Sequence, residues 1–378
     1  MWYDVLHTPS THSREAWKWA RLVISGYSEQ KDDLLVRSRK AAVVPVISIS
    51  DGSKRMVESV LALGAEGHLE ELVLHGIPTT TDVALLSQTV SKLFSFKIAG
   101  VQSRQLEAIL GALIEGPDIS LRTLHLHEEP QVSGDILARA ALKLNTLVLE
   151  APTSAQIGEI LTMLASSEDS KLRVLDLPHY GDPRDISYLS PETVAEALVK
   201  LEIANIFEEA ILSPGQMNSL MTKIKDTEDL RLTKLDLWNA EHADISQVAP
   251  DVVAGTVSRL ESVDISVTPP QTQSIFSRLQ LGGSKLKFLS LYGEVDLSAV
   301  TTEVLLRVLR MLESVELVGP AFTTAQVAAI ITMLSEESHG KLKKLHIIDP
   351  DDSEEEAYEL LVDIKANDMA NDILEIEL

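Results

Sequence analysis

The stretch Leu144-Asn-Thr-Leu147-Val-Leu149 has the pattern of a short strand. The segment that follows, Thr153-Ser-Ala-Gln156-Ile-Gly-Glu-Ile160-Leu161-Thr-Met163-Leu164, has the pattern of a helix. We expect apolar residues at strand positions one, four and six to face a core and the residues between them to face outward. In the second segment, Ile160, Leu161 and Leu164 fall on one helical face. A single strand and helix cannot bury their apolar faces, so this unit predicts stacked copies.

The strand pattern recurs along most of the chain. Neighbouring copies begin 23 to 34 residues apart, about 27 on average, which is within the leucine-rich range. Clear copies begin at Leu69, Leu93, Leu121, Leu144, Leu172, Leu198, Leu232, Leu260, Leu286, Leu312 and Leu342, and weaker ones at Val44 and Ile373. Thirteen stacked copies make one plausible body.

Two kinds of segment alternate between the strands. The longer kind includes Ser213-Pro-Gly-Gln216 and Thr268-Pro-Pro-Gln271, where a good N-cap residue precedes a proline at the first helical position. The shorter kind begins with Asp185-Ile-Ser, Asp244-Ile-Ser or Asp296-Leu-Ser. The alternation predicts a larger unit built from two repeats.

These strands, outer helices and paired repeats resemble the leucine-rich repeats of the ribonuclease-inhibitor type, and they are similar to the repeat regions of intracellular NLR-type immune receptors. The resemblance covers residues 43–378 and implies an α/β solenoid, a horseshoe with parallel strands on its concave face and helices on its convex face. It also implies a protein-binding concave face. The chain departs from the family at the ninth position, where asparagine or cysteine is usual and this sequence has Pro152, Tyr180, Ile206, Ala240 and Thr268. Binding of nucleases is therefore not carried over.

The ends differ from the repeats. Residues 1–42 hold three of the four tryptophans, and Trp17, Ala20, Val23 and Ile24 have helical spacing, so we expect a helical N-terminal cap. Residues 349–378 contain twelve Asp or Glu and one Lys, which predicts an acidic last repeat or C-terminal cap. A strand at the end of the chain would leave an edge through which two copies could associate. The leucine-rich repeats themselves are expected over residues 43–348.

Composition narrows the classes of function. The formal net charge of -24 opposes binding to nucleic acid or an anionic membrane and leaves a basic protein partner open. The chain has no cysteine and no apolar run long enough to span a membrane, which favours a cytoplasmic location. No catalytic triad pattern or GxxxxGK[ST] motif is readable, so we predict neither an enzyme nor a cofactor.

The best candidate binding surface is an acidic column at strand position five. Five of the six residues from Asp176 to Glu316 at this position are acidic, with serine as the exception. The column reads as a footprint for a basic ligand or as an ordinary solvated surface relieved by Lys200, Lys234 and Lys287. Nearby aromatic residues on outward positions are typical of interface hot spots. The candidate protein-binding residues are Asp176, Glu202, Asp236, Trp238, Asp264, Phe288, Tyr292 and Glu316.

A second cluster contains histidines. His125 and His127 are two residues apart on one strand and should face the same side, with His75 and His179 as candidate neighbours. Zinc needs a third ligand, and nothing in the sequence identifies one. We therefore interpret the histidines as exposed polar side chains and predict no metal site.

The sequence thus predicts a non-enzymatic recognition module, with innate immune sensing implied by the family resemblance alone. Two alternatives stay open. One is a regulatory adaptor of the GTPase-activator or ubiquitin-ligase substrate-receptor kind, and the other is a self-assembling structural protein.

Overall fold

The structure is a computed structural model that describes residues 21–25, 46–50, 52–116, 119–178, 183–207, 210–237, 244–335, 340–348 and 374–377. The chain divides into two compact units, Met1–Arg184 and Asp185–Leu378. Both units consist of strands that alternate with helices, as the repeat predicts. Among the described residues, no helix is long and apolar enough to cross a membrane.

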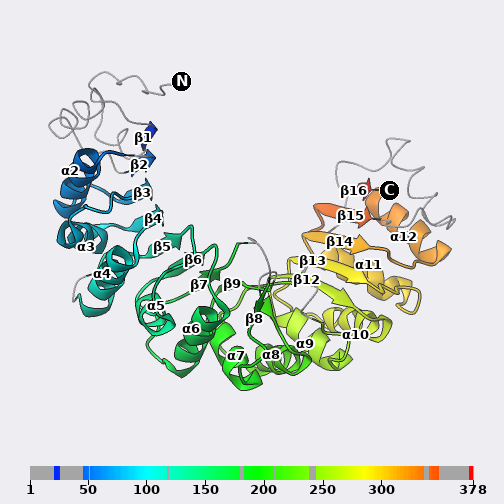
Figure 1. Cartoon of the computed structure of the whole chain (residues 1–378). Coiled ribbons are helices and arrows are strands. Elements are labelled where there is room, and N and C mark those ends of the chain that lie inside the picture. The colour runs from blue at the N-terminus through cyan, green and yellow to red at the C-terminus, as the bar shows by residue number, and fades with distance from the viewer. Residues whose placement is uncertain are drawn as a thin grey trace, which may run out of the picture. The chain divides into compact units, whose positions relative to one another are not determined.

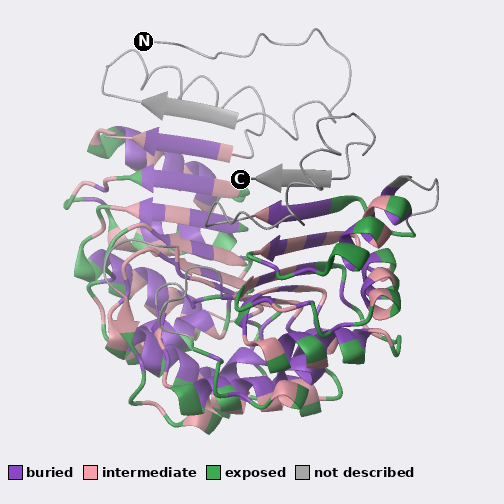
Figure 2. Cartoon of the chain, turned by 90° about the vertical axis from the view of Figure 1, so that its right-hand side faces the viewer, coloured by how far each residue is buried: buried purple, intermediate pink, exposed green. Residues whose placement is uncertain are grey.

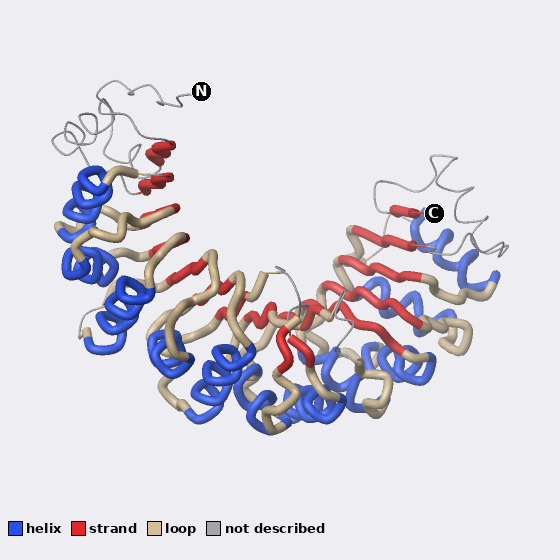
Figure 3. Tube along the Cα trace, viewed as in Figure 1, coloured by secondary structure: helices blue, strands red, loops and turns tan. Residues whose placement is uncertain are grey.

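The first unit contains a parallel sheet whose strands follow one another in chain order (Figure 1). Helices α2 to α6 connect successive strands and lie on one side of them (Figure 3). The elements are β1 (Arg21–Ser25), β2 (Val46–Ser50), α2 (Lys54–Ala65), β3 (Glu71–His75), α3 (Val83–Lys92), β4 (Ser95–Ala99), α4 (Ser103–Glu115), β5 (Thr123–Leu126), α5 (Gly134–Ala141), β6 (Thr146–Leu149), α6 (Ser154–Ser166) and β7 (Val174–Asp176).

The second unit repeats this plan. Strands β11 to β16 form a parallel sheet in chain order, and β8 and β10 form a separate two-stranded sheet. The elements are β8 (Arg184–Asp185), α7 (Pro191–Leu198), β9 (Ile203–Asn205), β10 (Ala210–Ile211), α8 (Pro214–Asp226), β11 (Lys234–Asp236), α9 (Pro250–Arg259), β12 (Ser262–Val267), α10 (Pro269–Leu279), β13 (Phe288–Gly293), α11 (Thr302–Met311), β14 (Ser314–Val318), α12 (Thr324–Ser335), β15 (Lys344–Ile348) and β16 (Leu374–Glu377).

The core lies between strands and helices. In the copy that contains β12, Leu260, Val263 and Ile265 occupy positions one, four and six and are each at most 1% exposed. From the helix side, Leu305 and Leu309 of α11 are fully buried. Figure 2 shows how buried positions recur along the strands and helices. Aliphatic packing of this kind, repeated copy after copy, supplies the main stabilisation.

The longer segments carry a buried glutamine that joins neighbouring repeats. Gln271, at the third position of α10, accepts the Thr268 backbone N–H at 2.9 Å and donates from Nε2 to the Ile245 and Val248 carbonyls at 2.8 and 2.9 Å. Since those carbonyls belong to the preceding repeat, one side chain both caps its own helix N-terminus and bonds that helix to the preceding repeat. Equivalent residues are Gln105, Gln156, Gln216 and Gln326.

The shorter segments begin with a tight turn. Asp244 accepts the backbone N–H of Ser246 at 2.7 Å, and Asp185 and Asp296 do the same two residues ahead, at 2.9 Å each. This turn presents the carbonyl of Ile245 to the glutamine of the following repeat. The alternation of the two segments therefore has a structural cause. The longer kind supplies the glutamine donor, and the shorter kind supplies the carbonyl acceptors of the hydrogen bonds between repeats.

Three expectations about the strands are corrected. Residues 21–25 form β1, which pairs with β2 in parallel, and not the helix expected from Val23 and Ile24. The apolar residues of β1, Leu22 and Ile24, lie opposite Ile47 and Ile49, which is the alternation of a strand. The rest of the expected cap, residues 1–20 and 26–42, lies outside the described residues.

The copy expected at Leu198 begins three residues later. Leu198 ends α7, and the buried strand residues are Leu201, Ala204 and Ile206. Its neighbour is aligned accordingly, because Thr233 donates its backbone N–H to the Glu202 carbonyl at 3.0 Å. The apolar run Leu198, Leu201 and Ile203 imitates the pattern, but Leu198 belongs to the helix. The steps around this copy become 29 and 31 residues, more even than expected.

At the C-terminal end, β16 pairs with β15 in parallel, with Ile376 opposite Ile347. The weak copy that we placed at Ile373 is therefore shifted by two residues, since Ile376 occupies position six and not position four. Residues 349–373, most of the expected acidic last repeat or C-terminal cap, lie outside the described part of the chain.

Candidate functional site

Position five of the second sheet forms a continuous row on the face opposite the helices. The parallel register places Asp236 opposite Asp264, Asp264 opposite Ser290, and Ser290 opposite Glu316. Adjacent strands are about 4.8 Å apart, so Asp236 and Asp264 are immediate neighbours, and Glu316 lies two strands beyond Asp264 on the same surface. We call Asp236, Asp264, Ser290 and Glu316 the acidic row.

Asp264 is the unusual member of the acidic row. The Asp264 Oδ1 and Ser290 Oγ atoms are both buried. Neither atom has a hydrogen-bond partner among the described residues. Burial raises the pKa of Asp264 to about 6; the nearby Ser290 hydroxyl opposes part of this rise, and the carboxylates of Asp236 and Glu316 add to it. A positive charge placed beside this acid would favour its charged form and lower its pKa again.

The other two acids have partners. Asp236 Oδ2 lies 2.8 Å from Lys234 Nζ on the same strand, and Glu316 Oε2 lies 3.0 Å from His346 Nδ1 on β15. Lys287, which we expected to relieve the row, instead pairs with Glu261 at 2.6 Å. The negative charges of the acidic row are thus compensated unevenly, and Asp264 is compensated least.

Two aromatic residues lie beside the row. The Tyr292 hydroxyl donates to the Leu237 carbonyl, so its ring reaches from β13 across β12 toward β11. Burial, together with the Asp264 and Asp236 carboxylates, raises the pKa of the Tyr292 phenol above its ordinary range. Phe288, at the start of β13, is 46% exposed. Tyr292 is therefore a fixed wall of the row, whereas Phe288 offers free apolar surface.

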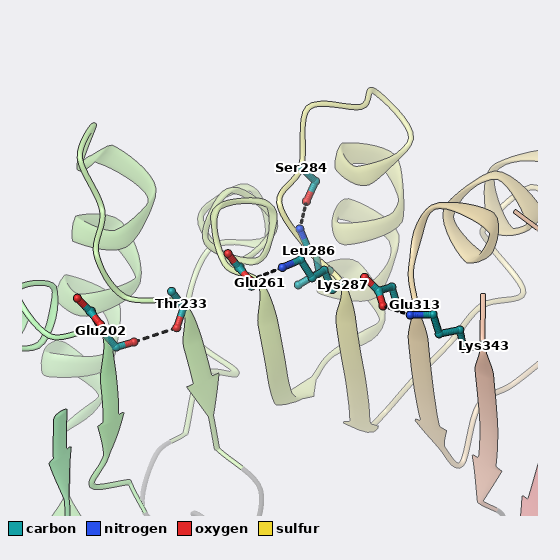
Figure 4. A network of polar contacts seen from close by, with 8 residues as sticks. All are labelled: Glu202, Thr233, Glu261, Ser284, Leu286, Lys287, Glu313 and Lys343. Carbon is teal, nitrogen blue, oxygen red and sulfur yellow. Dashed lines mark hydrogen bonds and ion pairs between the residues drawn. The ribbon is translucent and has the colours of Figure 1, made fainter. Parts of the chain in front are cut away.

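Glu202 belongs to a different row. Because the copy begins at Leu201, Glu202 occupies position two and Asn205 takes position five. The position-two row alternates in charge along β12 to β15, and its ion pairs Lys287–Glu261 and Lys343–Glu313 each measure 2.6 Å (Figure 4). Glu202 takes part there through its carbonyl, which accepts the Thr233 hydroxyl at 3.0 Å. This row lies at the N-terminal ends of the strands, three positions before the acidic row.

Two other candidates stand apart. Asp176 ends β7 in the first unit, whereas the acidic row lies in the second. Asp176 is therefore not assigned to the acidic row. Trp238 and residues 239–243 lie outside the described residues. Of the eight candidate residues, the structure brings together Asp236, Asp264, Tyr292, Phe288 and Glu316 around one surface.

The histidine pair has a neighbour that sequence reasoning missed. Glu150 Oε1 lies 2.9 Å from His125 Nε2 and 2.6 Å from His127 Nδ1. A signal was present in the sequence, because Glu150 and His127 both occupy position seven of adjacent copies. The three side chains are partly buried, which differs from the exposed histidines we expected.

In comparisons with known proteins, no family model matches the chain and no curated protein sequence matches it significantly.

Proposed function

We propose that this chain is a non-enzymatic protein-binding module and that the acidic row of its second unit binds a basic protein surface. The observation that carries the proposal is Asp264, a half-buried acid beside Asp236 whose buried Oδ1 lacks a hydrogen bond within the described residues. A buried carboxylate without full compensation costs free energy in the isolated protein. A lysine or arginine from a partner removes that cost.

The chemistry of the surroundings fits a protein partner. The row presents carboxylates from three of four adjacent strands on one surface, so a basic protein surface can meet several of them at once. Phe288 adds exposed apolar area beside the charges, a combination found at interface hot spots. Tyr292, fixed by its bond to Leu237, gives the surface a rigid wall and lowers the entropy lost on binding.

We also propose that the repeats are leucine-rich repeats of the ribonuclease-inhibitor type and that they form a horseshoe-shaped solenoid. The support is the α/β repeat with parallel strands in chain order and the alternation of two connecting segments. On this basis a cytoplasmic recognition role, as in NLR-type innate immune sensing, is the preferred biological setting. Small-angle scattering from the purified chain tests the shape, since a compact globular profile would contradict a curved solenoid.

Affinity capture from the native lysate tests the binding site. The row variant carries three substitutions that neutralise the acidic row, Asp236→Asn, Asp264→Asn and Glu316→Gln. The matched control neutralises three exposed carboxylates on the helices of the same unit, Glu192→Gln, Asp251→Asn and Glu303→Gln. Both variants change the net charge equally, so a difference between them reports the location of the charge.

We expect the wild type and the control variant to retain a basic protein and the row variant to lose it. Retention should weaken at higher salt, because part of the attraction is screened. Equal retention by the row variant, with its melting temperature not lowered, would place the site elsewhere and refute the proposal.

Self-association is the second candidate. Among the described strands, β16 ends its sheet, and a strand edge can pair with a second copy. Sedimentation velocity over a range of concentrations tests this function, with a constant monomer mass as the contradicting result.

A further inference from the structure

A separate cluster on the first unit joins residues from two neighbouring repeats. His125 lies on β5 at position five, His127 follows the same strand at position seven, and Glu150 follows β6 at position seven. Residues two apart on a strand point to the same face. The parallel register of β5 and β6 places Leu126 opposite Leu149, so the residues that follow, His127 and Glu150, stand side by side.

The donor atoms of this cluster converge on one point. A single carboxylate oxygen, Glu150 Oε1, lies 2.9 Å from His125 Nε2 and 2.6 Å from His127 Nδ1. The imidazole rings stack with their centroids 3.9 Å apart and their planes 27° apart. One ligand atom from each residue lies within 4.8 Å of the other two. Two histidines that were each solvated separately would not both contact the same carboxylate oxygen.

Two imidazole nitrogens and one carboxylate oxygen form a ligand set that divalent transition metals accept. Donors about 2.0–2.1 Å from a tetrahedral zinc ion lie roughly 3.3 Å from one another. The observed separations of 2.6 and 2.9 Å therefore need to open by about half an ångström, which side-chain rotation can supply. The side chains are 17%, 25% and 13% exposed, so an ion can enter from solvent while the ligands remain held.

A further histidine lies beside the cluster. The His75 ring centroid is 5.5 Å from that of His127, although β4 runs between their strands. The residue opposite His75 on β4 is Ala99, whose small side chain leaves room for the two rings to approach. His75 can support His127 or donate to an incoming ion after a change of rotamer.

One neighbouring charge opposes a cation. Lys97 lies opposite His125 on β4, and its ammonium group is 3.7 Å from Glu71. The pairing with Glu71 compensates part of the lysine charge and holds it to one side. Replacing Lys97 should therefore strengthen cation binding, whereas replacing a ligand should weaken it.

We propose that His125, His127 and Glu150 bind a divalent transition-metal ion, with Zn²⁺ the best match, and that the ion links two adjacent repeats of the first unit. Three protein ligands leave at least one coordination position for water or for a donor atom from a bound partner. The site lies in the first unit and the acidic row in the second. The two proposals therefore stand or fall separately.

Titration of the full chain with Zn²⁺ alone tests the site, after treatment with a chelator and in a non-coordinating buffer at neutral pH. Isothermal titration calorimetry measures affinity and stoichiometry, and the visible spectrum of added Co²⁺ reports the coordination. The ligand variants are His127→Ala and Glu150→Gln. The matched controls are His68→Ala and Glu159→Gln, which change exposed residues outside the cluster.

We expect one ion per chain, a loss of affinity of at least about tenfold in either ligand variant, and unchanged binding in the controls. Lys97→Met should bind Zn²⁺ about threefold more tightly, because a nearby positive charge is removed. This gain cannot come from misfolding. Zn²⁺ should also raise the melting temperature of the wild type and not of the ligand variants. No saturable binding by the folded wild type, or equal binding by both ligand variants, would overturn the proposal.

Discussion

Replacing Asp264 with asparagine should stabilise the second unit at neutral pH. The Asp264 carboxyl has a pKa of about 6 in the folded chain, against an ordinary value of 3.8. The charged form is therefore less favourable in the folded state than in the unfolded state. The protonated Asp264 carboxyl therefore contributes to the free energy of unfolding. This contribution is fully present below pH 3.8 and is lost as the pH rises through 6. The Asp264→Asn variant would not carry that penalty at any pH.

The size of the effect follows from the difference between the two pKa values. One pKa unit corresponds to about 1.4 kcal/mol, so the full difference is worth about 3 kcal/mol at most. Asp264 is partly open to solvent, which reduces the expected gain to about 1–2 kcal/mol. For a unit of this size, that gain raises the melting temperature by roughly 2–8 °C.

Thermal unfolding of wild type and Asp264→Asn at pH 7.5 and 4.5 measures the effect. The variant should melt at a higher temperature at pH 7.5, and its advantage should shrink at pH 4.5. The introduced amide could also hydrogen-bond to Ser290, which would add a gain that does not depend on pH. Only the pH-dependent part tests the reasoning, and an advantage equal at both pH values would refute it. Asp229→Asn, at an exposed position, controls for the general effect of charge.

Three further predictions follow from the same structure. Binding of the proposed basic partner should strengthen as the pH rises from 5 to 7 and lose this dependence in Asp264→Asn; an unchanged pH profile would separate Asp264 from the site. Gln271→Glu should lower stability by about 2–4 kcal/mol in denaturant unfolding, because a carboxylate would face two buried carbonyls, whereas the exposed Gln273→Glu should change it by less than about 0.5 kcal/mol. Gly293→Ala should cost roughly 1–3 kcal/mol, since Gly293 has φ +86° and an added Cβ would lie 2.5 Å from Ser266 Oγ; equal midpoints for wild type and variant would contradict that strain.

The alternation of strands and helices was predictable from the sequence because its signals are local. Apolar spacing within Leu144-Asn-Thr-Leu147-Val-Leu149 marks a strand, and the Thr-x-x-Gln opening before Ile157 marks a helix start. Each signal is repeated many times, so one ambiguous copy does not alter the fold. The error at Leu198 arose where a helix end and a strand start are both apolar, and local spacing fits two registers there.

The error at residues 21–25 had a related cause. Val23 and Ile24 fit a helical stripe, but Leu22 and Ile24 also fit a strand, and a segment of this length supports either assignment. Pairing with β2 decided the outcome. A parallel neighbour offers hydrogen bonds that an isolated segment lacks, so the tertiary environment overrides a weak local preference.

The sequence by itself determined the repeating strand and helix units and the shared strand position of Asp236, Asp264 and Glu316. Only the tertiary structure decided that Asp264 is the least compensated acid, that Glu202 lies in another row, and that Glu150 completes the histidine pair. The physical reason is the range of the interactions. Apolar periodicity acts within one repeat, whereas burial, ion pairing and ligand convergence depend on the register between repeats, which is set by packing of the whole sheet.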